Sequence, residues 1–221
     1  RGHVKRMKAA VAALSGQKDM LDIRLCQLVN LMENGKPVKM SKRAGTFVTV
    51  RDVIDAVGAD VTRFIMLTRR SDQTLDFDYA KVTEQSRDNP VFYVQYAHAR
   101  ACSVLRQPGI NGEDVTGAGD AALDRLTAPA EMAVIKALAS WPRLVVSAAQ
   151  SHEPHRVAFY LMDLAASFHA LWTAGREAPE LRFIRDDDAG LTAARLCLVK
   201  ATALVIRSGL GVLSIQAREE M

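Results

Sequence analysis

Cysteine is scarce in this chain of 221 residues, and its placement excludes two kinds of protein. Cys26, Cys102 and Cys197 are odd in number and far apart, and no two of them form a Cys-x-x-Cys pair. This pattern argues against a disulfide framework or a zinc site and favours a reducing, cytoplasmic location. His152 and His155 form no metal motif either, because the proline between them spoils a shared helical face. We therefore expect no bound metal.

Long apolar runs and an initiator methionine are also missing. No stretch approaches the roughly 18 unbroken apolar residues of a membrane-spanning helix, so none is predicted. The run from Ala9 to Leu14, which follows a basic start, is too short for the apolar part of a signal peptide. Because the chain opens on Arg-Gly-His, we expect it to be a piece of a longer protein.

The remaining composition is that of an ordinary globular protein. Hydrophobic residues make up 49% of the chain and charged residues 24%. A net charge of +4 permits a nucleic-acid partner without requiring one, since a local basic patch is enough to hold a polyanion. The length suits one large domain, or a small domain with an appendage.

The first 80 residues predict a mixture of helices and strands. An alanine-rich helix over 4–14 should stop at Gly16. The alternating segment 23–31 predicts a strand, and Asn34-Gly35 is a hairpin turn because both residues tolerate positive φ. A return strand over 36–40 should follow.

Further along, capping residues mark two short helices and a connector. Thr49 should cap a helix that Gly58 ends, and Asp60 should cap the next helix. The polar segment 71–79 is interpreted as a connector, and 79–88 as a further helix. Asn89, followed by proline, should begin a long helix that ends near Gln107.

The rest of the chain is helical in pattern. The predicted helices cover 120–127, 130–140, 142–150, 154–174 and 188–208. The fold class is therefore mainly α: a small α/β remnant, residues 1–80, followed by an all-α helix bundle, residues 81–221. Whether residues 1–60 pack without further strands is left open, because an uncovered apolar face and a bare sheet edge would remain.

Lys39-Met40-Ser41-Lys42-Arg43 is the most informative stretch. Two ammonium groups three residues apart on a loop after a hairpin can close on a triphosphate and neutralise charge as pyrophosphate leaves. A solvated basic turn is the alternative. The residue order, the hairpin before it and the Gly-Thr-Phe after it favour the phosphate-binding interpretation.

This loop resembles the Lys-Met-Ser-Lys motif of class I aminoacyl-tRNA synthetases. The chain is similar to the arginyl enzymes beyond the loop as well. The similar blocks are 38–50 (VKMSKRAGTFVTV), 58–69 (GADVTRFIMLTR), 75–79 (LDFDY) and 89–100 (NPVFYVQYAHAR). The resemblance implies the end of a catalytic domain, at 1–80, followed by a helical anticodon-binding domain.

The resemblance also implies roles for the loop. Lys39 and Lys42 would be catalytic and stabilise the ATP phosphates, while Met40 and Ser41 would complete the ATP-binding loop. The parent enzyme would use ATP with Mg²⁺, arginine and tRNA(Arg), whereas this piece would hold no cofactor itself. The family's His-x-Gly-His motif is missing here, so we expect no catalysis by this piece alone. We also expect a monomer without membrane contact.

Aromatic and basic side chains recur at helical spacing in the second half. Residues of this kind can stack on and neutralise single-stranded RNA, although a buried core is the usual role of aromatics in helices. With the resemblance, the tRNA-binding candidates are Tyr96, Arg100, Tyr160, Trp172 and Met221. Arg106, Arg195, Lys200 and Arg207 are further candidates for contact with the RNA backbone.

Two other functions fit part of the sequence. A non-catalytic tRNA- or RNA-binding module would have no use for an intact Lys39–Lys42 loop. Another class I synthetase, of the cysteinyl or methionyl type, is disfavoured by the blocks at 58–64 and 89–96.

Overall fold

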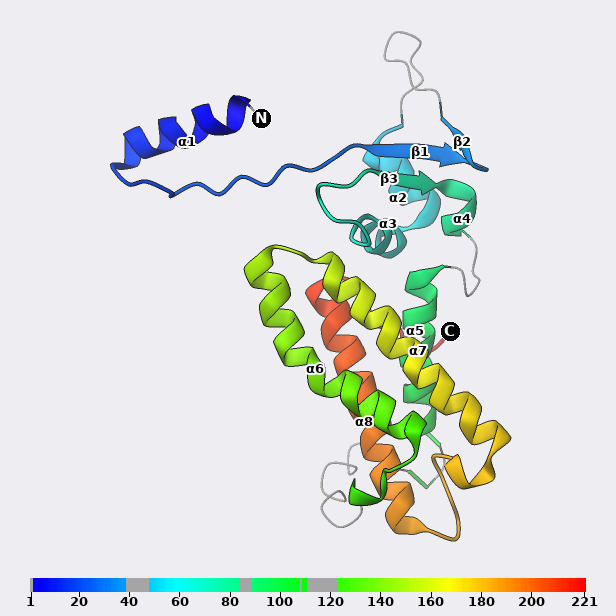
Figure 1. Cartoon of the computed structure of the whole chain (residues 1–221). Helices are drawn as coiled ribbons and strands as arrows, with labels where there is room; N and C mark the ends of the chain where they lie inside the picture. Colours follow the sequence, from blue (N-terminus) through cyan, green and yellow to red (C-terminus); the bar gives the residue numbers. More distant parts are fainter. Residues whose placement is uncertain (1, 39–47, 84–88, 108, 111–122) are drawn as a thin grey trace.

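The computed structural model describes residues 2–38, 48–83, 89–107, 109–110 and 123–221. Figure 1 shows a small α/β part at one end of a bundle of long helices. This confirms the predicted fold class of a mainly helical protein with a small sheet. The Lys39–Lys42 loop, with Met40 and Ser41, lies outside the described residues.

Three short strands form the sheet, in the order β2-β1-β3. They are β1 (Val29–Glu33), β2 (Lys36–Pro37) and β3 (Leu75–Asp78). β1 and β2 are antiparallel, and the turn between them confirms the predicted hairpin, with φ of 50° at Asn34 and 75° at Gly35. β1 and β3 are parallel, with Leu31 opposite Phe77.

The sequence-based prediction for this sheet was wrong in two places. The segment interpreted as a polar connector contains β3, in which Leu75 and Phe77 are buried while Asp76 is exposed. The strand predicted over 23–31 is shorter, because residues before Val29 lack a continuous partner strand. Strand formation here depends on pairing between segments more than 40 residues apart, which local pattern does not reveal.

The carboxylate of Asp78 joins the end of β3 to the hairpin turn. It accepts hydrogen bonds from the backbone N–H groups of Gly35 at 2.8 Å, Asn34 at 3.2 Å and Ala80 at 3.1 Å. These bonds, the one from Gly35 foremost, hold the pKa of Asp78 below its ordinary value. The hairpin that leads into residues 39–47 is thereby fixed to the sheet.

Two helices, α2 (Val50–Val57) and α3 (Ala59–Met66), connect the hairpin to β3. Thr49 caps α2 as predicted, in a capping box with Asp52. Gly58 ends α2 with φ of 86° and also begins α3, so the prediction that Asp60 caps α3 was wrong. The short α4 (Tyr79–Thr83) follows β3 directly.

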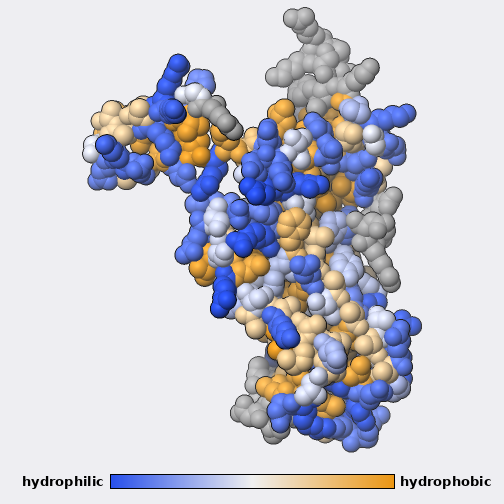
Figure 2. Space-filling view, viewed as in Figure 1, coloured by the Kyte–Doolittle hydropathy of each residue, from blue (hydrophilic) through white to orange (hydrophobic). Residues whose placement is uncertain are grey.

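The N-terminal helix α1 (Gly2–Ser15) ends at Gly16, as predicted, but it buries no side chain. Figures 1 and 2 show it as an arm that projects from the α/β part and carries apolar surface. The exposed apolar residues of this region are Met7, Leu14, Met20, Leu25 and Leu28. By contrast, Leu31 and Val53 join the core, so only the later part of residues 1–60 is packed.

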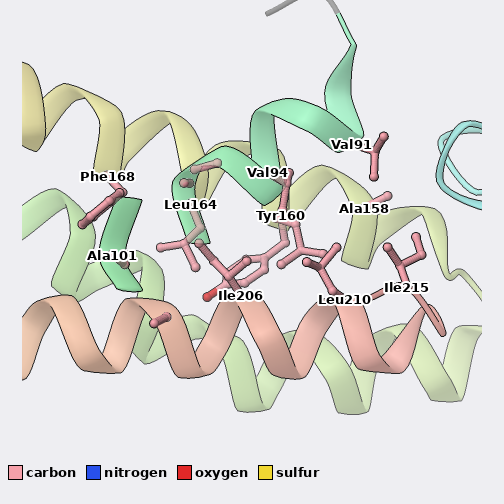
Figure 3. Packing of buried hydrophobic residues seen from close by; sticks show 14 of the residues in the cluster. Val91, Val94, Ala101, Ala158, Tyr160, Leu164, Phe168, Ile206, Leu210 and Ile215 are labelled. Atoms are coloured by element: carbon pink, nitrogen blue, oxygen red, sulfur yellow. The ribbon is translucent and has the colours of Figure 1, made fainter. Parts of the chain in front are cut away.

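The bundle consists of α5 (Pro90–Leu105), α6 (Pro129–Ser151), α7 (His155–Glu177) and α8 (Ala189–Val212). The short 3₁₀ helices η2 (Leu123–Arg125) and η3 (Pro179–Leu181) lie in the connections, and Asn89 caps α5 as predicted. Figure 3 shows side chains from α5, α7 and α8 meeting in the core, among them Val94, Leu164 and Ile206. The α/β part joins the bundle where α3 packs against α5.

One helix, α6, replaces the two helices predicted on either side of Pro142. A proline inside a helix removes one hydrogen bond and costs about 3 kcal/mol. Contacts with α7 hold the helix on both sides of it: Trp141 stacks on Tyr160 at 5.1 Å, and Arg156 donates to the Ser147 hydroxyl at 2.7 Å. Tertiary packing therefore overrides the local signal.

By length and mean hydropathy alone, α6, α7 and α8 could each cross a membrane. The sequence prediction of no such helix was based on unbroken apolar runs, whereas these helices carry scattered polar residues. In the structure, apolar residues of α7 and α8 pack against each other and against α5, while α6 packs against α7 and α8 and keeps most of its apolar segment outside the core.

Candidate functional site

The main candidate site is a cavity of about 860 Å³ at the surface of the bundle. Three walls enclose it: the facing sides of α5 and α7 form the first, the chain just after η3 the second, and the end of the chain the third. It is lined by Tyr96, Ala99, Arg100, Ser103, Val104, Arg106, Gln107, Trp172, Gly175, Arg176, Arg182, Phe183, Ile184, Glu219, Glu220 and Met221. Aromatic rings and arginines are the notable groups among them.

Arg100 lies between two aromatic rings in this cavity. Its guanidinium carbon is 4.2 Å from the centre of the Tyr96 ring and 4.9 Å from that of the Trp172 ring. Both distances fall within the range of cation–π attraction. The three side chains therefore form one stack that joins α5 to α7.

His169 of α7 forms hydrogen bonds that link this stack to the backbone of α5. Its Nδ1 lies 3.2 Å from Nη1 of Arg100, and its Nε2 lies 3.3 Å from the backbone carbonyl of Tyr93. Since a guanidinium only donates and a carbonyl only accepts, His169 fits as the neutral tautomer that carries its proton on Nε2. In this tautomer Nδ1 accepts a hydrogen bond from Arg100, and Nε2 donates one to the carbonyl of Tyr93.

The chain after η3 forms a second wall, and a buried ion pair fixes it. Arg195 of α8 donates to Glu131 of α6 at 2.7 Å and to the backbone carbonyls of Glu180 and Arg182 at 2.7 and 2.8 Å. The side chains of Arg195 and Glu131 are 5% and 2% exposed. This pair holds the segment that presents Arg182 and Phe183 to the cavity.

Gly175 allows this wall to approach α7 closely. A Cβ at that position would lie 2.9 Å from the backbone carbonyl oxygen of Leu181, closer than side-chain carbons come to backbone. Phe183 can then pack 5.9 Å from the Trp172 ring, measured between ring centres.

The end of the chain forms the third wall. Arg106 donates to the backbone carbonyl of Glu219 at 3.0 Å and lies 3.4 Å from the carboxylate of Glu220. Met221 lines the cavity and is 55% exposed. The three walls therefore come from separate segments between residues 96 and 221, which only the fold brings together.

The structure brings four of the five predicted tRNA-binding residues to this one cavity: Tyr96, Arg100, Trp172 and Met221. Tyr160 lies elsewhere, in the core. It is 7% exposed, its hydroxyl donates to the carbonyl of Ala137 at 3.0 Å, and burial raises its pKa to about 12. We therefore assign Tyr160 a packing role in place of the predicted one.

The basic residues predicted to contact the RNA backbone also differ in their positions. Arg106 lines the cavity, whereas Arg195 is buried in its ion pair and unavailable to an RNA backbone. Lys200 and Arg207 belong to α8 and do not line this cavity.

Among the aromatic and basic residues of the site, sequence reasoning missed three: Arg176, Arg182 and Phe183. The last two stand in a loop whose pattern carries no helical period. A signal was present, because Arg182-Phe183-Ile184-Arg185 places an aromatic ring and an isoleucine between two arginines in a polar connection. Among the residues described, no cluster of histidine, cysteine or acidic side chains is arranged to hold a metal.

Comparison with known proteins places this site within a family. The model of the DALR anticodon binding domain matches residues 94–221, which include all three walls of the cavity. The chain belongs to this family. The matched segment of the DALR domain begins within α5 and contains α6, α7 and α8.

Similar proteins extend the likeness to the α/β part that precedes the DALR domain. The arginine–tRNA ligases of Rhodospirillum rubrum and Ruegeria pomeroyi are each 59% identical over the whole of this chain. The chain spans 38% of the length of each.

Solved structures of similar proteins also match most or all of this chain. A Campylobacter jejuni structure described as an arginyl-tRNA synthetase superposes with a TM-score of 0.84 at 29% identity, covering 100% of this chain and 46% of that one. The Thermus thermophilus arginyl-tRNA synthetase gives 0.60 at 26% identity, with 86% and 34% covered. The DALR domain and the α/β part thus occur together in these proteins.

Proposed function

We propose that this chain is the tRNA-binding C-terminal part of an arginine–tRNA ligase and that its cavity takes unpaired bases of the anticodon loop. The observation that carries the proposal is the stack of Arg100 between Tyr96 and Trp172, inside the segment that matches an anticodon-binding family. The arginine–tRNA ligases that are 59% identical support the choice of tRNA(Arg).

The chemistry of the cavity suits such a ligand. Anticodon loops present unstacked bases, and stacking on an aromatic side chain contributes about 1–3 kcal/mol per base. Tyr96, Trp172 and Phe183 supply the rings, and the arginines around them supply positive charge for phosphates. The guanidinium of Arg100 also offers hydrogen-bond donors to a base or a phosphate.

The parent enzyme would activate arginine with ATP and Mg²⁺ and transfer it to the 3′ end of tRNA(Arg), in the cytoplasm. Lys39 and Lys42 would neutralise the ATP phosphates in that reaction, with Met40 and Ser41 shaping the loop. This chain alone would bind tRNA without charging it and would act as a monomer. The non-catalytic module and the cysteinyl or methionyl enzyme are not favoured by the similar proteins.

A binding experiment tests the proposal. Fluorescently labelled tRNA(Arg) transcript is titrated with the 221-residue protein in about 0.1 M salt, with unlabelled tRNA(Arg), tRNA(Cys) and tRNA(Met) as competitors. We expect tRNA(Arg) to compete best, and Trp172→Ala to weaken binding about 10-fold or more, as loss of one stacked base implies.

Phe159→Ala provides the matched control, because Phe159 is an exposed aromatic residue of α7 that does not line the cavity. Equal competition by all three tRNAs, or equal effects of the two alanine variants, would overturn the proposal. Arginylation by the 221-residue protein would contradict its assignment as non-catalytic.

A further inference from the structure

We propose that Gln95 and His98 of α5 are positioning residues that hold the end of the chain, residues 216–221, in the place where it completes the RNA-binding cavity. The inference builds on the proposed function, because it assigns a purpose to the third wall. Neither residue lines the cavity, so neither is proposed to touch RNA.

The two side chains bind two alternate carbonyl groups of the end segment. Nε2 of Gln95 donates to the carbonyl of Gln216 at 2.9 Å, and Nδ1 of His98 lies 2.8 Å from the carbonyl of Arg218. Gln95 and His98 stand three residues apart on one face of α5, while their acceptors stand two residues apart in a segment without regular secondary structure. The chain end is therefore aligned with the α5 helix over about one turn.

Burial makes these hydrogen bonds important to the protein. Gln95 is 1% exposed and His98 is fully buried. A buried donor without a partner keeps the cost of its lost hydration, so both side chains favour the docked chain end over a free one. Leu213 and Ile215, each 4% exposed, anchor the residues just before.

The ion pairs on the outer side of the segment are weaker candidates for the same task. Arg106 lies 3.8 Å from Glu219, and Arg207 lies 3.3 Å from it, but all three side chains are more than 40% exposed. Exposed ion pairs contribute little and are screened by salt. The buried amide and imidazole should dominate the position of the chain end, and with it that of Met221.

The chemistry of the His98 bond suggests a matched pair of variants. Because a carbonyl only accepts, His98 must donate through Nδ1. The side-chain nitrogen of asparagine can occupy nearly the same place as Nδ1, whereas leucine fills the space without a donor. His98→Asn should therefore preserve the position of the chain end, and His98→Leu should release it.

The rate of trypsin cleavage measures whether the chain end is docked. The carbonyl that His98 binds belongs to the peptide bond after Arg218, which trypsin cleaves. The fragment released from the native protein is followed by mass spectrometry. We expect His98→Leu and Gln95→Leu to speed cleavage at this bond at least 5-fold, and His98→Asn to stay within 2-fold of the original protein. Val134→Ala, which opens the core far from this segment in sequence, controls for general loosening.

Binding of the tRNA(Arg) transcript is measured for the same variants. We expect His98→Leu to weaken binding about as much as Met221→Ala does, and the double variant to be no worse than either single one. Cleavage that is no faster in His98→Leu than in Val134→Ala would overturn the inference. So would a released chain end with unchanged RNA affinity.

These experiments distinguish failure of this inference from failure of the proposed function. If Trp172→Ala leaves tRNA binding intact, the cavity itself is not the RNA site. If Trp172→Ala weakens binding but His98→Leu changes neither cleavage nor affinity, the cavity stands and the positioning role of His98 is wrong.

Discussion

The guanidinium of Arg100 on α5 and the indole of Trp172 on α7 lie 4.9 Å apart, measured from the guanidinium carbon to the ring centre. The contact joins two helices across the mouth of the cavity. It gives Arg100 a fixed orientation, which a long, flexible side chain would otherwise lose entropy to adopt.

The first prediction concerns the charge of Arg100. Replacing it with methionine keeps an apolar contact with Tyr96 and Trp172 but removes the cation. We expect affinity for tRNA(Arg) to fall about 10-fold and the slope of log affinity against log salt to lessen by about 0.7–0.9, the loss of one phosphate contact. Titrations at several salt concentrations measure both quantities. Arg143→Met, an exposed arginine of α6 outside the cavity, should change the affinity little.

The second prediction concerns the buried pair of Arg195 and Glu131. Removing one partner leaves a buried charge unpaired, so Arg195→Met should lower the free energy of unfolding by about 3–5 kcal/mol. Urea denaturation followed by circular dichroism measures this. Arg70→Met breaks an exposed pair with Asp72 and should cost less than about 1 kcal/mol. Similar losses in the two variants would contradict the structural role assigned to Arg195.

The third prediction compares two glycines of α8. A Cβ at Gly209 would lie 2.6 Å from Cδ2 of the buried Leu161 and 3.2 Å from the Trp141 ring, whereas a Cβ at Gly211 would meet nothing within 4 Å. Gly209→Ala should therefore destabilise the protein by about 1–3 kcal/mol through overpacking. Gly211→Ala should be neutral or stabilise by up to about 1 kcal/mol. Thermal unfolding of both variants checks the difference in sign.

The fourth prediction concerns pH and Asp78. The folded protein lowers the pKa of this carboxyl below its ordinary value of 3.8, chiefly through the N–H of Gly35. Its contribution to stability is therefore fully present above that value and is lost as the pH falls through the lower, folded pKa. Asp78→Asn should be less stable than the original protein at pH 7, and the two should converge in acid. Urea midpoints at pH 7, 5 and 3 measure this, and a constant difference would refute it.

Local chemistry in the sequence determined much of the secondary structure. The Asn34-Gly35 turn, the Thr49 cap, the stop at Gly58 and the start of α5 at Asn89 each depend on a few neighbouring residues. Such features are readable because φ preferences and capping hydrogen bonds act over three or four positions. The predicted roles of Lys39 and Lys42 depend on resemblance and stay predictions.

Only the tertiary structure decided the rest. β3 exists because β1 pairs with it, and α6 continues through Pro142 because α7 packs along both of its halves. The sequence predicted both Tyr96 and Tyr160 as tRNA contacts, yet Tyr96 lies at the cavity and Tyr160 lies in the core. Which face of a helix turns inward depends on the other helices, and so does the meeting of Arg100, Phe183 and Met221 from segments distant in the chain.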